Sequence, residues 1–93
     1  MNDGQNQRFR VNPTVSAAAM ADGAVLIDSA TGECFELNRT GARIWESLVR
    51  GDELDGVVAA IAAESSVQRS IVAADTAILI DALARRGIIV AKR

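Results

Sequence analysis

Few side chains in this sequence could carry out catalysis, and their types and spacing argue against an enzyme. The 93-residue chain has no histidine and no tyrosine, and Cys34 is its single cysteine. A cysteine nucleophile needs a histidine or a cation beside it to hold it as a thiolate, and neither stands near Cys34 in the sequence. One thiol also cannot form an internal disulfide or a zinc cage of several thiolates. We therefore expect Cys34 to be an ordinary strand residue and the chain to be no enzyme.

Three carboxylates, Asp28, Glu33 and Glu36, lie close enough in the sequence to suggest a site for a hard cation. Calcium-binding loops, however, place their oxygen ligands densely in one loop, and no such loop is present. We expect these groups to be solvated surface carboxylates, with no metal and no other cofactor. Trp45, the one tryptophan, recurs at helical spacing with apolar residues, which favours a core anchor over a binding residue.

The charge distribution bears on possible partners. The net charge is −2, and residues 38–93 carry eight Lys and Arg against seven Asp and Glu, spread along the whole segment rather than gathered into a basic face. A nucleic-acid partner is therefore not expected. The polar start of the chain has no apolar signal-peptide region, and no apolar run approaches the ~20 residues of a membrane span. These features favour a cytoplasmic protein with no membrane partner.

Composition and length predict one domain with an aliphatic core, because 49% of the residues are hydrophobic and only 3% are aromatic. Residues 1–12 are polar and lack periodicity, so we expect a flexible N-terminal arm, with the domain spanning residues 13–93. Three short segments then predict an antiparallel meander: 14–20, 24–27 and 33–37. Asp22-Gly23 is a strong hairpin signal between the first two.

The second half of the sequence predicts three helices. Asn38 is a good N-cap for the first, and Gly51 is placed to end it in a left-handed conformation. A second helix follows over about 54–62, and a third over about 70–86, with Gly87 behind it. The last apolar residues, 88–90, are expected to fold back on the core. The predicted fold class is thus α+β.

The third predicted helix carries two stripes of apolar side chains, on different sides of the helix. One contains Val72, Leu79 and Leu83, and the other contains Ile71, Ala74, Ile78 and Ala82. The first stripe is enough to cover a small sheet, while the second could be core or could line a groove. The strand over 33–37 is the last of the meander and is expected to be a free edge. An apolar helix face beside a free edge is the geometry for strand addition by a peptide.

The ordered set of residues from Val15 to Val90 resembles the PqqD-like family. The resemblance is carried by Val25-Leu26-Ile27-Asp28, Gly32, Phe35, the segment Leu37-Asn38-Arg39-Thr40-Gly41-Ala42-Arg43-Ile44-Trp45, Gly51, Asp75, and the ending Leu83 with Gly87-Ile88-Ile89. In length and in Gly41-Ala42-Arg43-Ile44-Trp45, the chain is similar to the stand-alone members of lasso-peptide systems. The small residues 17–19 of the first strand depart mildly from the family pattern.

The resemblance implies a winged-helix-like domain in which a three-stranded antiparallel sheet packs on three helices. It also implies a non-catalytic recognition element that binds the leader segment of a ribosomally made precursor peptide and presents it to a separate leader protease or other modifying enzyme. Carried onto this chain, the leader-binding strand comprises Glu33, Cys34, Phe35, Glu36 and Leu37. Combined with our count of helical faces, the groove wall comprises Ile71, Ala74, Asp75, Ile78 and Ala82.

A winged-helix DNA-binding regulator has the same order of elements and is the alternative reading, although the chain lacks a basic helix face. The spacing alone leaves two questions open. Ile71 and Ile78 could be core or groove residues, and Asp75 could be an ordinary exposed residue or a polar contact in the groove.

Overall fold

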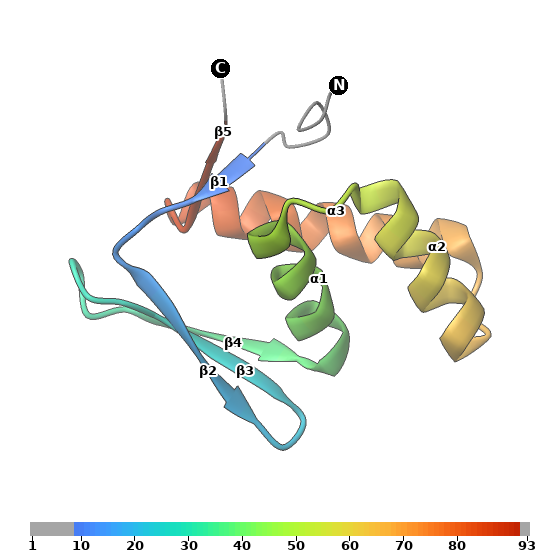
Figure 1. The fold of residues 1–93 in the computed structure, drawn as a ribbon, viewed down its shortest axis with the longest axis horizontal. Helices are drawn as coiled ribbons and strands as arrows, with labels where there is room; N and C mark the ends of the chain where they lie inside the picture. Colours follow the sequence, from blue (N-terminus) through green and yellow to red (C-terminus); the bar gives the residue numbers. More distant parts are fainter. Residues whose placement is uncertain (1–8, 92–93) are drawn as a thin grey trace.

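The computed structural model describes residues 9–91 and has the α+β architecture that the sequence predicts (Figure 1). Strands β2 (Val15–Met20), β3 (Gly23–Asp28) and β4 (Cys34–Asn38) form an antiparallel sheet in the order β2-β3-β4. Helices α1 (Arg39–Arg50), α2 (Leu54–Ser65) and α3 (Arg69–Arg85) follow in the chain. No helix within residues 9–91 is long and apolar enough to cross a membrane.

The meander is held together by a tight turn and a close backbone approach. Residues 21–22 turn the chain between β2 and β3, and Gly23 then lies opposite Asn38 of β4. A Cβ atom on Gly23 would be 1.9 Å from the backbone oxygen of Leu37, so only glycine fits at this position. The hairpin signal in the sequence therefore also sets how closely β4 packs on β3.

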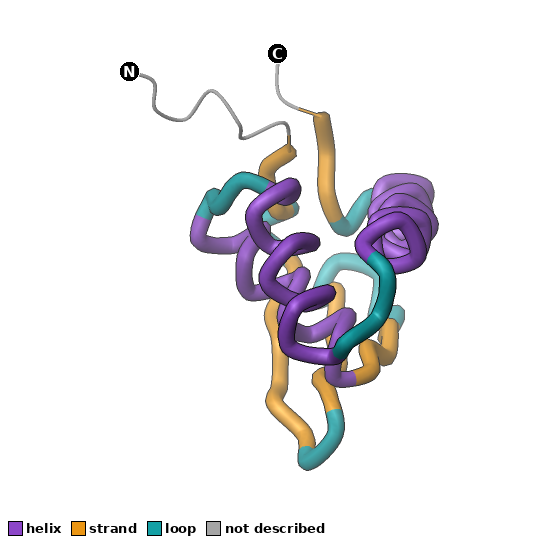
Figure 2. Tube along the Cα trace, turned by 90° about the vertical axis from the view of Figure 1, so that its right-hand side faces the viewer, coloured by secondary structure: helices purple, strands orange, loops and turns teal. Residues whose placement is uncertain are grey.

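Helix α1 begins and ends at the capping residues that the sequence predicts. The Asn38 side chain accepts a hydrogen bond from the Gly41 amide at 2.8 Å, which confirms the predicted N-cap of α1. Gly51 ends α1 in the left-handed region with φ 84°, also as predicted. Figure 2 shows the helices grouped on one side of the sheet, and no helix of residues 9–91 covers its other face.

The core forms two adjoining clusters. Leu26 of β3, Trp45 of α1, Leu83 of α3 and Ile89 form the centre of the one between sheet and helices. The other, between the helices, is built around Ile44. Trp45 is only 5% exposed, which confirms its role as a core anchor.

The prediction of a flexible N-terminal arm over residues 1–12 is wrong for residues 9–11, which form a strand. Strand β1 (Phe9–Val11) pairs antiparallel with strand β5 (Ile89–Ala91), and the Asn12 side chain donates a hydrogen bond to the Gly87 oxygen. Residues 1–8 lie outside the described residues. The predicted return of the C-terminal tail to the core is confirmed, since Ile89 is buried. The reason for the error is that the β1 partner lies 80 residues away in the chain.

A small polar network fixes the start of the meander. The Thr14 hydroxyl lies 2.7 Å from Asp28 Oδ1, and the Ala30 amide donates to the same oxygen at 2.9 Å. These two donors, Thr14 above all, lower the pKa of the Asp28 carboxyl below its ordinary value. Asp28 is therefore a structural residue that joins the ends of β2 and β3, rather than a solvated carboxylate.

Candidate functional site

Within residues 9–91, strand β4 is a free edge of the sheet, as the sequence predicts, and the alternation of its backbone groups identifies the N–H and C=O groups that do not pair with β3. The Asp28 amide donates to the Glu33 oxygen at 2.9 Å, and Phe35 and Leu37 continue this series opposite Leu26 and Ala24. Hydrogen-bonded and non-hydrogen-bonded pairs alternate along an antiparallel ladder. The N–H and C=O groups of Cys34 and Glu36 therefore point away from β3, toward the open edge.

The two apolar stripes of α3 differ in exposure, which shows whether Ile71 and Ile78 belong to the core. Val72 and Leu83 of the first stripe are buried. In the second stripe, Ile71 is 51% exposed and Ile78 is 68% exposed. Ala74 and Asp75 are also exposed, and Ala82 is partly buried. The second stripe is therefore an uncovered helix surface rather than core.

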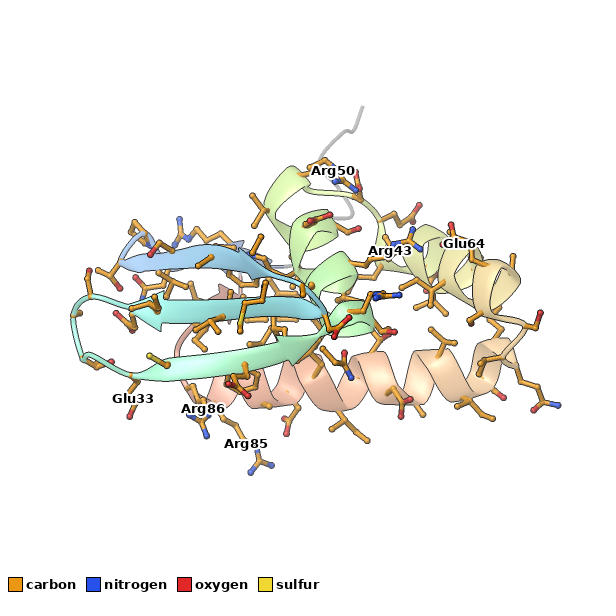
Figure 3. The ribbon with its side chains drawn as sticks, turned by 90° about the horizontal axis from the view of Figure 1, so that it is seen from below. Glu33, Arg43, Arg50, Glu64, Arg85 and Arg86 are labelled. Atoms are coloured by element: carbon orange, nitrogen blue, oxygen red, sulfur yellow. The ribbon has the colours of Figure 1, made fainter. Side chains whose placement is uncertain are left out.

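Strand β4 and helix α3 run alongside each other in the view of Figure 3, and a hollow is lined by residues of both. Toward the middle of α3, this hollow of about 280 Å³ is lined by Leu37 of β4 together with Asp75 and Leu79 of α3. At the other end of β4, the Arg86 guanidinium lies 5.0 Å from the centre of the Phe35 ring. This spacing is that of a cation–π contact, which closes the floor of the groove at the end of α3.

The structure divides the predicted strand residues into two groups. Phe35 and Leu37 face the helices and pack in the core, whereas Cys34 and Glu36 are exposed and offer their backbone groups at the edge. Glu33 precedes β4 and uses its oxygen to pair with Asp28, so it is outside the strand in which we placed it. Two groove residues were missed, Arg86 and Leu79, because the sequence pattern assigns one to a helix end and the other to the core stripe.

The site has the character of a binding surface. Cys34 is exposed, and within residues 9–91 no group of three or more Cys, Asp or Glu side chains is placed to hold a metal ion. Within residues 9–91, the groove offers the backbone groups of Cys34 and Glu36, which do not pair with β3, on one side and apolar side chains of α3 on the other. An extended peptide satisfies both, since its backbone can hydrogen-bond with the edge while alternate side chains reach the helix.

Comparisons with known proteins agree with this geometry. The model of the family "Coenzyme PQQ synthesis protein D (PqqD)" matches residues 23–89, which include β3, β4 and all three helices. The fold and the matched residues define a small domain of the PqqD-like type. The chain belongs to the PqqD family.

Two solved structures are similar over most of this chain. One is TbiB1 in complex with the TbiA(beta) leader peptide, with a TM-score of 0.80 and 33% identity over 90% of this chain and 98% of that chain. The other is lasso peptide synthetase B1 complexed with the leader peptide, with a TM-score of 0.81 and 32% identity over 89% and 98%. A search of curated proteins found no match.

Proposed function

We propose that this protein is an adaptor that binds the leader segment of a ribosomally synthesised precursor peptide and presents it to a separate leader protease or other modifying enzyme. One observation carries the proposal: the free edge of β4 shares a hollow with Asp75 and Leu79 of α3, next to the exposed Ile78 in the chain, in a protein that is similar over nine tenths of its length to two proteins solved with leader peptides. The similarity to lasso peptide synthetase B1 favours a lasso-type peptide as the product.

In this proposal the leader adds to the sheet as a fourth strand. The outward backbone groups of Cys34 and Glu36 make the hydrogen bonds, and leader side chains pack against the exposed stripe of α3. The apolar anchors supply most of the affinity, because each buried aliphatic side chain contributes roughly 1.5–3 kcal/mol before ordering costs. The proposed contact residues are Glu33, Cys34, Phe35, Glu36, Leu37, Ile71, Ala74, Asp75, Ile78 and Ala82.

The proposed contribution to catalysis is local concentration alone. The chain has no histidine, and Cys34 lies on an exposed strand edge with no activating partner evident within residues 9–91. A docked precursor meets the modifying enzyme more often, so the effect is expected mainly in the apparent KM for the full-length precursor. We also propose a cytoplasmic location, because a ribosomally made precursor is available there.

The winged-helix DNA-binding alternative is not supported. Residues 38–93 carry a net charge of only +1, and their lysines and arginines are spread along the whole segment rather than gathered on one helix face. A DNA-binding face needs basic side chains to neutralise phosphates.

A titration tests the proposal. The leader encoded beside the gene for this chain is labelled with a fluorophore, and its anisotropy is measured as the purified protein is added. We expect saturable binding that is little affected by salt, and no binding to a DNA duplex at the same protein concentrations. Binding to the duplex without binding to the leader would reject the proposed function.

A further inference from the structure

A second hollow lies on another side of α3 from the β4–α3 groove. It is larger, about 660 Å³, and is lined by β1, the start of α2 and the face of α3 that carries Ala73, Ala77 and Ala84. At 100° per residue, this face is about 130° around the helix axis from Ile71 and Ile78. In Figure 1, α3 accordingly lies between β4 below it and β1 above it. The two hollows can thus be occupied at the same time.

The shape of this second hollow suits a helix. Its floor contains the buried Val58 and Thr76 and the half-buried Ile80. The Thr76 hydroxyl already donates to the Val72 oxygen at 2.8 Å, so the floor presents no unpaired polar group at this position. The α3 side of the hollow is made of exposed alanines, whose short side chains let another helix approach closely. An amphipathic helix with apolar anchors fits such a groove.

The charges around the hollow specify the occupant further. Glu53, Asp55 and Asp81 line it, and no lysine or arginine is among the described residues that do so. Asp81 is paired with Arg85 at 2.8 Å, whereas no ion pair joins Glu53 or Asp55 to any other side chain within residues 9–91. The rim is therefore acidic, and a helix that carries lysine or arginine beside its apolar residues is complementary to it.

We propose that this second hollow docks an amphipathic, basic helix of the modifying enzyme that receives the leader. The inference rests on the proposed function, because an adaptor that presents one molecule to another needs a second surface that stays free while the leader is bound. The second hollow is separate from the leader groove and has an apolar floor, and its acidic rim favours a basic partner.

Three tryptophan substitutions at exposed helix positions test the assignment. Ala77→Trp fills the second hollow, Asp75→Trp fills the hollow beside β4, and Ala63→Trp on the exposed side of α2 fills neither. The probes are the labelled leader and the modifying enzyme encoded beside the gene for this chain, each titrated separately with the full-length protein. Circular dichroism verifies that each variant is folded.

Ala77→Trp is expected to weaken binding of the enzyme at least tenfold, the equivalent of about 1.4 kcal/mol or more for a blocked anchor, and to leave the leader Kd within about twofold. Asp75→Trp should show the reverse pattern, and Ala63→Trp should change neither affinity. A double charge reversal, Glu53→Lys with Asp55→Lys, should weaken enzyme binding in the same way without adding bulk. Raising the salt concentration should weaken wild-type docking as well.

Several results would overturn the inference. Unchanged enzyme affinity in both Ala77→Trp and the charge-reversed variant would place the enzyme elsewhere. Loss of leader binding in Ala77→Trp would make this hollow part of the leader site. If the wild-type protein self-associates in sedimentation experiments and Ala77→Trp does not, the hollow would be assigned to a second copy of the chain. Failure of the wild-type protein to bind the leader would instead reject the proposed function, and the enzyme titration without leader keeps the two failures distinguishable.

Discussion

At the scale of single residues, Ile78 is the side chain on which leader affinity should depend most. It is 68% exposed on α3, so replacing it removes no core packing. We expect Ile78→Asp to raise the Kd for the leader by roughly tenfold to a hundredfold, the equivalent of about 1.5–3 kcal/mol for one lost apolar anchor. Anisotropy titration of the labelled leader measures the change.

The control for Ile78→Asp is Val49→Asp, because Val49 is also a well-exposed aliphatic residue on a helix but lies away from the groove. It should bind the leader like the wild-type protein. Unfolding of Ile78→Asp, seen by circular dichroism, would mean that Ile78 contributes to the core. Equal loss of binding in both variants would mean that the effect is not specific to the groove.

Asp28 should make the stability of the domain depend on pH. The hydrogen bonds from Thr14 and Ala30 lower its pKa in the folded state. Its stabilising effect is therefore fully present above the unfolded-state pKa of about 3.9 and is lost as the pH falls through the lower folded-state pKa. We expect Asp28→Asn to lower the free energy of unfolding at pH 7. The difference in this free energy between the variant and the wild-type protein should become smaller as the pH approaches 3. Urea denaturation at a series of pH values measures both.

The exposed carboxylate Glu46 provides the comparison for Asp28. Glu46→Gln should leave the free energy of unfolding nearly unchanged at pH 7. A difference between Asp28→Asn and the wild-type protein that stays constant from pH 7 to pH 3 would show that the carboxylate network is not responsible.

At the scale of elements, the position of β4 depends on Gly23. A Cβ atom there would collide with the Leu37 backbone, and backbone atoms cannot move aside as a flexible side chain can. We expect Gly23→Ala to lower the free energy of unfolding by about 3 kcal/mol or more. Leader binding should weaken too, because β4 carries the edge to which the leader adds.

Gly32 gives a matched control for Gly23, since its φ is 77° and a Cβ atom there would meet nothing within 4 Å. Gly32→Ala should cost only about 1–2 kcal/mol, the price of a left-handed conformation for a residue with a side chain. Chemical denaturation compares the two variants. Equal losses would indicate that the Gly23–Leu37 approach has no special importance.

The elements could be predicted from the sequence to the extent that their signals are local. Asn38, Gly51 and the hairpin at Asp22-Gly23 act within a few residues, so the meander and α1 could be placed from the sequence. Strand β1 could not, because three residues in a polar segment give no periodicity and their partner is at the far end of the chain.

The candidate site could be predicted only in part, for a similar reason. The strand edge and the exposed stripe of α3 follow from order and periodicity. Which stripe is buried depends on how α3 packs against α1 and α2, and the sequence of α3 alone does not predict this packing. The second hollow was not foreseen, because alanines at 73, 77 and 84 are unremarkable until α2 and β1 are set beside them.

At the scale of the whole molecule, the protein alone should leave a precursor peptide chemically unchanged. Its proposed role is to bind and present, and the exposed Cys34 is assigned no chemistry. Mass spectrometry of precursor incubated with the protein should detect no cleavage and no mass change. Cys34→Ser should support the modifying enzyme as well as the wild-type protein does, and a leaderless substrate should gain nothing from either.

The opposite result is equally clear for this prediction. A mass change that appears with the protein alone and disappears with Cys34→Ser would make the chain an enzyme.

The central claim, strand addition at the β4–α3 groove, is tested most directly by amide NMR of the protein with and without its leader. We predict shift changes concentrated on residues 33–37 and 71–82, and slower hydrogen exchange at the Cys34 and Glu36 amides, which point to the open edge. The amides of Ala17 and Ala19 provide the internal control. The Ser29 amide donates to the Thr14 oxygen at 3.0 Å, and the alternation that follows turns them to the opposite edge of the sheet. Changes confined to α1 and α2, or new protection on β2 in place of β4, would contradict the account.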